Sequence, residues 1–488
     1  MLGKLNIRYC FGLNPSACGG VIGIPEERAI LYQCGAHIVL LHTETREQSF
    51  LPIAMTGKGA VSYGKKVIAV ADGLASVHLF DATSLRKKKI LSFPPDLLPS
   101  NPSLASSTST SSESGAFKCI ALSEDGRLCV AQSGAPDWTL VLWNIEKSAK
   151  VVASTRLSLP EDAEVSHVAF CPWDASVVIA LGRGVFRLFR LQEGQFKPAT
   201  LNLRRDSANF LSYLWLKSSS SNGTTNNGNA LVVGTEAGEI LLIENLEFRA
   251  VLYPLAETPP SSLTPIYALG AMSSGAFLAG TSNATLRYFT RSNITNSSSS
   301  SSSSKEVMFQ FSGSYHVREV NADVLSIVMN SDDSFCMGTS SQQLLVASIN
   351  HLKAAKDSVA EAEALVTSFH GPGMSNRSAV TGLDIALWRS ILVSCGRDGT
   401  VRVWSLADRK IEILKRFIEE PLGLSLHPSG VYLVVVFEDR VRIMSILQQD
   451  LFVFKEILLK NCSMVKFARG GNHFAVVRYF FTYRLCEQ

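Results

Sequence analysis

The stretch Ser394-Cys395-Gly396-Arg397-Asp398-Gly399-Thr400-Val401-Arg402-Val403-Trp404 has the pattern of two short strands joined by a tight turn. Asp398-Gly399 is the expected turn, because glycine tolerates the positive φ that such hairpins need and Asp398 accepts backbone N–H bonds there. Ser394 and Trp404 carry a hydroxyl and an indole N–H that need partners in a buried corner. We therefore expect Ser394, Asp398, Gly399 and Trp404 to hold together a structural corner between strands.

The same order of features recurs along the chain with changing residues. Each unit has a β-branched strand, a turn rich in Ser, Asp, Pro or Gly, a second apolar strand, a Gly or Asp corner, and a third strand that ends in a bulky residue. One example combines 119–126, 128–130 and 140–143. The units lie near residues 19–48, 55–92, 116–153, 163–196, 207–250, 265–291 and 320–350, and then near 378–415, 417–455 and 457–480.

The spacing of these units identifies the fold. Equivalent positions lie 46 residues apart from Trp143 to Phe189, and 40 residues apart from Trp404 to Met444. A repeat of about 40–45 residues is the period of a propeller blade, and constant four-strand units favour a propeller over an array of β-sandwiches. Because propellers close with about four to eight blades, seven units make a ring and three do not. The sequence thus predicts an all-β fold, a WD-type β-propeller with one seven-bladed ring followed by a partial second propeller.

The chain divides into a first propeller, a connecting segment and the blades of a second, incomplete propeller. Serine tracts interrupt the first part, and their composition is that of flexible linkers. An alanine-rich stretch at 352–366 predicts a helix within the connection. The end blades of an incomplete ring are expected to expose apolar faces. The boundaries are 1–350 for the first propeller, with Ser-rich insertions at 100–114, 218–229 and 296–305, then 351–377 for the connection and 378–488 for the second propeller.

Charge and composition disfavour several classes of function. The 46 basic and 42 acidic residues give a net charge of +4, which is too small to indicate nucleic-acid binding or an anionic membrane. No apolar run reaches the roughly 18 residues of a membrane span, and charges at Lys4 and Arg8 argue against a secretory signal. The ten cysteines include no C-x-x-C pair, and most lie among apolar residues, as Cys119, Cys129 and Cys336 do. We expect buried thiols in a reducing compartment.

The usual signatures of catalysis, cofactor binding and metal binding are missing from the sequence. Its Gly-Lys stretches lack the spacing of a phosphate-binding loop, and its histidines form no ligand pair or cluster. Ser394, Asp398 and His370 are the residue types of a catalytic triad, but nothing like a nucleophile elbow surrounds the serine. A propeller hydrolase needs acidic or histidine side chains that converge on the central channel, and no such set is evident. We predict no catalytic, cofactor or metal site, and we expect an incomplete corner network because His370 lies far upstream.

Arg86, Lys87, Lys88 and Lys89 form a basic run in the second unit. Such a run is most often the solvated edge of a blade. The alternative is an electrostatic contact with an acidic partner such as a microtubule surface, which added salt weakens.

The segment 419–444, which contains His427, resembles the cilia- and flagella-associated protein 57 family of WD-repeat axonemal proteins. The similarity continues through 452–456 and 470–477, and the upstream segments 186–194 and 232–238 resemble the same family in the same order. Many families share the blade pattern, whereas the His427 segment is far more specific.

The resemblance implies a non-enzymatic scaffold of the ciliary or flagellar axoneme, which helps anchor or regulate inner dynein arms and motility. The implied partners are inner dynein arm components and microtubule-associated proteins, while the protein-binding residues stay unknown. In that family a completed second propeller and a long coiled coil follow, and this chain departs from the pattern after about Val477, so we expect it to lack those parts. The alternative is a cytoplasmic WD-repeat adaptor in another complex, in trafficking or ubiquitin ligation.

Overall fold

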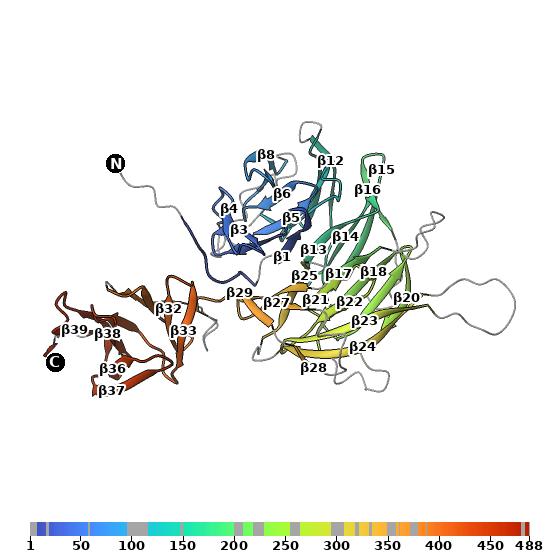
Figure 1. The fold of residues 1–488 in the computed structure, drawn as a ribbon. Coiled ribbons are helices and arrows are strands. Elements are labelled where there is room, and N and C mark those ends of the chain that lie inside the picture. The colour runs from blue at the N-terminus through green and yellow to red at the C-terminus, as the bar shows by residue number, and fades with distance from the viewer. Residues whose placement is uncertain are drawn as a thin grey trace. The chain divides into compact units, whose positions relative to one another are not determined.

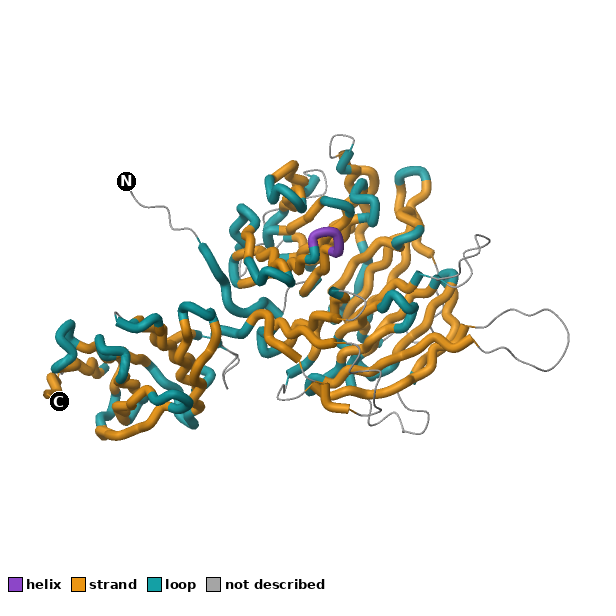
Figure 2. The backbone as a smooth tube through the Cα atoms, viewed as in Figure 1, coloured by secondary structure: helices purple, strands orange, loops and turns teal. Residues whose placement is uncertain are grey.

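The chain folds into two compact units in the computed structural model, one that ends at Val366 and one that begins at Thr367. Strands dominate both units, and the helical element among the described residues is a short 3-10 turn, η1 (Pro25–Glu27) (Figure 2). No helix in the described part of the chain is long and apolar enough to cross a membrane. The structure describes residues 7–15, 19–56, 59–94, 116–146, 150–199, 208–217, 229–253, 264–293, 307–317, 322–330, 334–348, 358–360, 362–370, 379–386, 388–479 and 484–487.

The described part of the first unit contains seven sheets (Figure 1). Strands that are consecutive in the chain pair antiparallel, apart from one short strand at Ser358–Ala360, which pairs in parallel at the edge of the sixth sheet and separates the last two strands of the seventh. We number these sheets 1 to 7. Their strands are β1 (Val21–Ile24), β2 (Ala29–Cys34), β3 (His37–His42) and β4 (Gln48–Phe50); β5 (Ala60–Gly64), β6 (Val67–Ala71), β7 (Ser76–Asp81) and β8 (Lys87–Ser92); β9 (Phe117–Leu122), β10 (Leu128–Ser133), β11 (Thr139–Asn144) and β12 (Lys150–Arg156); β13 (Glu164–Cys171), β14 (Asp174–Arg183), β15 (Val185–Gln192) and β16 (Gln195–Ala199); β17 (Phe210–Leu216), β18 (Ala230–Thr235), β19 (Ile240–Glu244) and β20 (Glu247–Leu252); β21 (Ala268–Ala271), β22 (Phe277–Gly280), β23 (Thr285–Asn293), β24 (Val307–Val317) and β28 (Ser358–Ala360); and β25 (Val324–Met329), β26 (Ser334–Thr339), β27 (Leu344–Ser348) and β29 (Ala362–Val366).

The second unit contains three sheets of the same kind, numbered 8 to 10. The first strands of neighbouring sheets contact each other in this unit, β30 with β34 and β34 with β38. The strands are β30 (Val380–Ile385), β31 (Ile391–Gly396), β32 (Thr400–Ser405) and β33 (Lys410–Arg416); β34 (Gly423–Leu426), β35 (Tyr432–Val436), β36 (Arg440–Ile446) and β37 (Leu451–Leu458); and β38 (Cys462–Phe467), β39 (His473–Arg478) and β40 (Arg484–Glu487).

Hydrophobic cores lie between neighbouring sheets because the middle strands are apolar on both faces. In β18 every side chain is buried, so alternate residues enter the cores on opposite sides of the sheet. Leu231 and Val233 pack against sheet 4, whereas Ala230 and Val232 pack against sheet 6. The series of cores ends where sheet 7 packs on sheet 1, with Val366 buried beside sheet 1. The first unit is therefore a closed seven-bladed ring, and the predicted fold class is confirmed.

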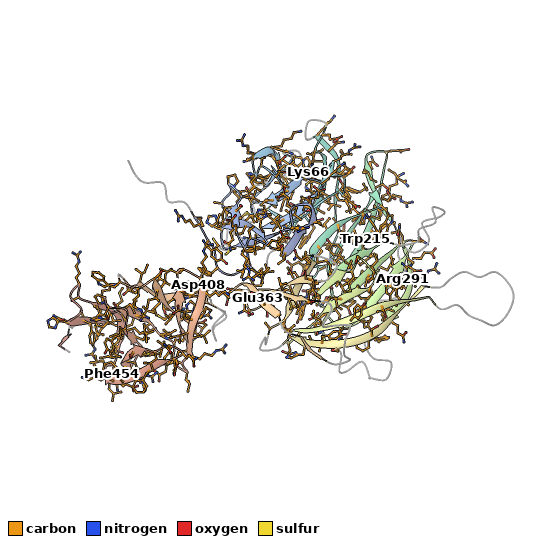
Figure 3. The ribbon with its side chains drawn as sticks, in the orientation of Figure 1. Lys66, Trp215, Arg291, Glu363, Asp408 and Phe454 are labelled. Carbon is orange, nitrogen blue, oxygen red and sulfur yellow. The ribbon has the colours of Figure 1, made fainter. Side chains whose placement is uncertain are left out.

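Polar contacts also join the two sheets at which the ring closes. The backbone N–H of Leu13 donates to the carbonyl oxygen of Gln342 over 3.2 Å, and Leu13 is buried in the core that sheets 1 and 7 share. Arg46, between β3 and β4, forms a 2.6 Å ion pair with Glu363 on β29, which Figure 3 labels. The segment before β1 and the last strand of sheet 7 thus both contribute to the closure.

The helix predicted over 352–366 is wrong for the described part of that stretch. Residues Ser358–Ala360 form β28 in a parallel pairing with β24, and Ala362–Val366 form β29 in an antiparallel pairing with β27. Alanine has the highest helix propensity, but propensity is a weak preference, and pairing with two sheet edges overrides it here. Part of the expected connection thus belongs to the first unit. The Ser-rich insertions, apart from residue 229, lie outside the described residues.

Candidate functional site: a buried corner and a central cavity

A chain of hydrogen bonds joins Trp404, Ser394, His370 and Asp398 in sheet 8. The indole Nε1–H of Trp404 donates to Ser394 Oγ over 2.9 Å, and the same Oγ lies 2.9 Å from Nε2 of His370. His370 Nδ1 lies 2.9 Å from Oδ1 of Asp398. Trp404 also stacks on Phe369 with the ring centroids 4.9 Å apart. Each polar group in this buried corner therefore has a partner, as burial requires.

Asp398 anchors the turn between β31 and β32. Its Oδ1 accepts the backbone N–H of Thr400 over 3.1 Å and the Thr400 hydroxyl over 2.7 Å. Its Oδ2 accepts an N–H from the Arg402 guanidinium over 2.9 Å. Gly399 follows with a φ of +71°, and a Cβ added there would lie 2.7 Å from the carbonyl oxygen of Phe417. Only glycine fits this turn without strain.

The charge of Asp398 is strongly stabilised in the folded state. Burial alone would raise the pKa of its carboxyl group, but hydrogen bonds from His370 and Thr400 and the charge of Arg402 outweigh that effect. The pKa of Asp398 consequently lies well below its usual range. The carboxylate is thus ionised at neutral pH and makes charge-assisted hydrogen bonds to the turn.

The expectation of an incomplete network is wrong. His370 lies 24 residues before Ser394 in the chain, yet its imidazole bridges the serine and the aspartate. This order of groups is also that of a catalytic triad, but Ser394 is completely buried and its Oγ already accepts the indole N–H. A substrate carbonyl has no access to that oxygen, so the arrangement fits a structural corner.

The sequence interpretation missed Thr400 and Arg402 as members of the corner. Both residues are buried, and the Nε–H of Arg402 donates to Thr400 Oγ1 over 3.1 Å. Residues 400, 402 and 404 alternate along β32 and so share a face of the sheet, and Asp398 lies in the turn directly before that strand. This alternation of polar residues before a tryptophan is the signal that predicts the larger network.

Sheet 2 has a smaller corner that the sequence interpretation also missed. In the turn after β6, Asp72 Oδ2 accepts the Ser76 hydroxyl over 2.7 Å and lies 3.1 Å from His78 Nε2. Asp72 Oδ1 accepts the backbone N–H of Leu74 over 2.9 Å. Asp72-Gly73 thus repeats the Asp-Gly turn of sheet 8, with the histidine supplied by the following strand.

The first strands of the ring surround a central cavity of about 1040 Å³. Its lining comes from β9, β13, β17, β21 and β25 and from the segments that precede β1 and β5. Lys118 and Glu164 form a 3.0 Å ion pair on this lining, and the ammonium of Lys118 lies 5.1 Å from the Trp138 ring centroid. His167 Nε2 lies 3.0 Å from the carbonyl oxygen of Leu211. These charged and histidine side chains are thus engaged by protein groups.

Two other kinds of candidate site were considered in the sequence, a metal site and the basic run at 86–89. Among the described residues, no group of three or more His, Cys, Asp or Glu side chains is placed to hold a metal ion. In the basic run on β8, Lys88 pairs with Asp81 at 2.6 Å and Lys89 donates to the carbonyl oxygen of Ile145 over 2.6 Å. Arg86 and Lys87 are exposed at this edge of sheet 2.

The closed ring of seven sheets, with its Asp-Gly turns and buried tryptophans, defines the class: a WD-type β-propeller protein. The particular relatives are cilia- and flagella-associated proteins. The chain is 29% identical over 359 residues to cilia- and flagella-associated protein 57 A of Tetrahymena thermophila, covering 71% of this chain and 26% of that protein. It is 24% identical over 519 residues to cilia- and flagella-associated protein 57 of Mus musculus, covering 96% of this chain and 38% of that protein. The resemblance carried by the His427 segment is confirmed.

These relatives are much longer than the present chain. It spans 26% of the Tetrahymena protein and 38% of the mouse protein. No protein-family model matches the sequence. Among solved structures, the chain is similar to the β-propeller domain of Cps50 (Swd1) from Myceliophteria thermophila, at 13% identity and a TM-score of 0.36 over 79% of this chain and 96% of that one.

Proposed function

We propose that this chain is a non-enzymatic scaffold of the ciliary or flagellar axoneme, where it helps anchor or regulate inner dynein arms. The observation that carries the proposal is the similarity to cilia- and flagella-associated protein 57, which extends over 96% of the chain in the mouse comparison. The fold supports a binding role, because a ring of repeated sheets offers a large rigid surface to protein partners. The proposed partners are inner dynein arm components and microtubule-associated proteins.

The proposal assigns the buried corner a structural role. Ser394, Asp398, Gly399 and Trp404, with His370, hold sheet 8 together, and partners bind elsewhere on the surface. The supporting observation is that the Ser394 and Trp404 side chains are buried and already hydrogen-bonded. Substitutions at this corner are therefore expected to change stability before they change any contact.

The deciding experiment expresses the tagged full chain in a ciliated cell and extracts the cilia with detergent. The proposal expects the tag to stay with the insoluble axoneme and to leave with salt or with loss of inner dynein arms. Complete release into the detergent-soluble fraction would overturn it. A tag that instead stays in the cytoplasm or on membranes would favour the adaptor function in trafficking or ubiquitin ligation.

The exposed end of the basic run is the proposed point of contact with an acidic microtubule surface. Arg86 and Lys87 are exposed on the outer edge of sheet 2, so charge reversal there leaves the core intact. The double variant R86E/K87E should lower axoneme retention and its sensitivity to salt. Lys65 and Lys66 are equally exposed in the same sheet, and K65E/K66E is the matched control. Equal retention of both variants would exclude the basic run as the contact.

A further inference from the structure

Two cysteines of the first unit differ from the other described cysteines. Cys10 and Cys34 are partly exposed, whereas the other six cysteines whose side chains the structure describes are buried. Burial raises the pKa of the Cys129 thiol to about 12 and that of Cys395 to about 11, which makes those thiols unreactive. Cys10 and Cys34 are thus the described thiols that solvent oxidants can reach.

The fold holds the two cysteines against each other. Gln48 on β4 fixes Cys10 with two bonds, because its Oε1 accepts the Cys10 backbone N–H over 2.7 Å and its Nε2 donates to the Cys10 carbonyl oxygen over 3.0 Å. Cys34, at the end of β2, has its Sγ 3.1 Å from the carbonyl oxygen of Phe11. Both cysteine side chains pack against the core that sheets 1 and 7 share, and the two thiols lie close enough to shift each other's pKa.

The surroundings favour ionisation of one thiol of the pair. The hydrogen bond from Cys34 lowers the pKa of Cys10 to about 7, although burial opposes that shift. The pKa of Cys34 is raised by the same hydrogen bond and by burial, so its thiol keeps the proton. Tyr9 and Tyr32 are the titratable neighbours, and burial raises the pKa of Tyr32, which therefore stays neutral. Near neutral pH a substantial fraction of the molecules therefore pairs a Cys10 thiolate with a Cys34 thiol.

We propose that Cys10 and Cys34 form a redox modification site, which a hydroperoxide oxidises to a disulfide and a thiol reductant restores. The Cys10 thiolate attacks one oxygen of hydrogen peroxide, the O–O bond breaks, the other oxygen leaves as hydroxide and takes up a proton to become water, and Cys10 becomes a sulfenic acid. The Cys34 sulfur then attacks the Cys10 sulfur, the S–O bond breaks, and water leaves. Overall the two thiols lose two protons and two electrons, and hydrogen peroxide is reduced to two molecules of water.

The disulfide would act at the closure of the ring. The segment 7–15 lies along sheet 1, where the backbone N–H of Asn14 donates to Gln33 over 2.8 Å, and Leu13 reaches Gln342 of sheet 7. A bond between Cys10 and Cys34 fastens this segment to β2 covalently. The Cys34 sulfur already lies 3.1 Å from the carbonyl oxygen of Phe11, the residue after Cys10, so the two sulfurs start as neighbours and would form the disulfide at a bond length of about 2.05 Å.

The test uses the full chain, reduced and then exposed to hydrogen peroxide, with free thiols blocked by N-ethylmaleimide. Cys18 shares a tryptic peptide with Cys10, so the C18A variant serves as the background. Mass spectrometry without reductant should find the Cys10 and Cys34 peptides joined and lighter by two hydrogens than their sum, and dithiothreitol should separate them. C129A, which removes a buried thiol, is the matched control and should keep the link.

Two results would overturn the proposal. One is a folded protein in which both cysteines stay separately alkylated after peroxide. The other concerns the C34A variant. In C34A, peroxide should leave a sulfenic acid on Cys10 that dimedone traps. The rate of Cys10 alkylation at pH 7 should also fall about tenfold, because less of Cys10 is thiolate. Unchanged Cys10 alkylation in C34A would show that Cys34 does not activate Cys10.

Discussion

The closed ring and the three-sheet unit are built from similar sheets but differ in how many neighbours each sheet packs against. In the ring every sheet packs against a neighbour on both sides, since the last core joins sheet 7 to sheet 1. In the second unit the cores join sheet 8 to 9 and sheet 9 to 10. The end sheets expose Leu383 and Ile385, at 55% and 53%, and Met464, at 65%. Blade stability therefore resides in the interfaces between sheets as much as in the sheets themselves.

The second unit has polar contacts that link its three sheets. Asp384 on β30 accepts the Leu426 backbone N–H over 2.8 Å and pairs with Lys466 at 2.9 Å, so one carboxylate joins all three sheets. The Trp404 corner adds a second buried network within sheet 8. We infer that this unit depends on a few strong polar sites, whereas the ring distributes its stability over its cores.

The largest expected effect is that of W404A. Trp404 is 2% exposed, and its removal leaves a cavity and takes away the indole N–H that donates to Ser394, so the second unit should lose about 3–5 kcal/mol of its free energy of unfolding. W143A, in a ring tryptophan that is 1% exposed, is the matched substitution. Hydrogen exchange resolved by peptide should show each loss confined to its own unit. Equal loss in both units from either variant would show that they unfold together.

The sequence predicted the sheets because strand composition and blade spacing are local properties. The units near 116–153 and 163–196 match sheets 3 and 4 closely, since glycine turns such as Asp125-Gly126 and Glu193-Gly194 fix where strands end. It failed at β29, where alanines carry little strand signal and a partner strand decides the structure. The division into 1–350, 351–377 and 378–488 stays a prediction, although the compact units meet after Val366.

The second prediction concerns the Asp398 carboxylate, whose contribution to the free energy of unfolding should depend on pH. In D398N an uncharged amide replaces the partner of Arg402, so the second unit should lose about 3 kcal/mol at pH 7. The folded pKa of Asp398 lies below its ordinary value of 3.8, so its contribution is present above pH 3.8 and disappears as the pH falls toward the folded pKa. Denaturant unfolding of both proteins at pH 7 and pH 3 should show the difference shrink. A constant difference would contradict this assignment.

The residue types of the candidate site could be predicted from the sequence, but the contacts between residues distant in the chain could not. Ser394, Asp398, Gly399 and Trp404 follow from one local hairpin pattern. The role of His370 does not follow from that pattern, because its contact with Ser394 joins residues that are 24 positions apart and depends on the tertiary fold. The Cys10–Cys34 contact likewise depends on Gln48, which fixes the segment before β1 against sheet 1.

A smaller effect is expected at the ring closure. Arg46 and Glu363 are 44% and 63% exposed, so water screens their attraction, and R46A should cost about 0.2–1 kcal/mol. The loss should disappear in about 1 M salt, where the screening length is roughly 3 Å. Thermal unfolding of the first unit at low and high salt measures it. A loss above about 2 kcal/mol would show that the ring closes by this pair more than by the core around Val366.

The smallest effect is expected at the open face of sheet 8. Leu383 lies on β30 and is 55% exposed, so L383S should change the free energy of unfolding by less than about 0.5 kcal/mol. V393S is the control on the neighbouring strand β31, where Val393 is fully buried in the core with sheet 9, and it should cost about 2 kcal/mol or more. Denaturant unfolding at two protein concentrations compares them. A concentration-dependent loss in L383S as large as that in V393S would mean that another copy covers this face, and the contrast between a closed ring and an open unit would then fail.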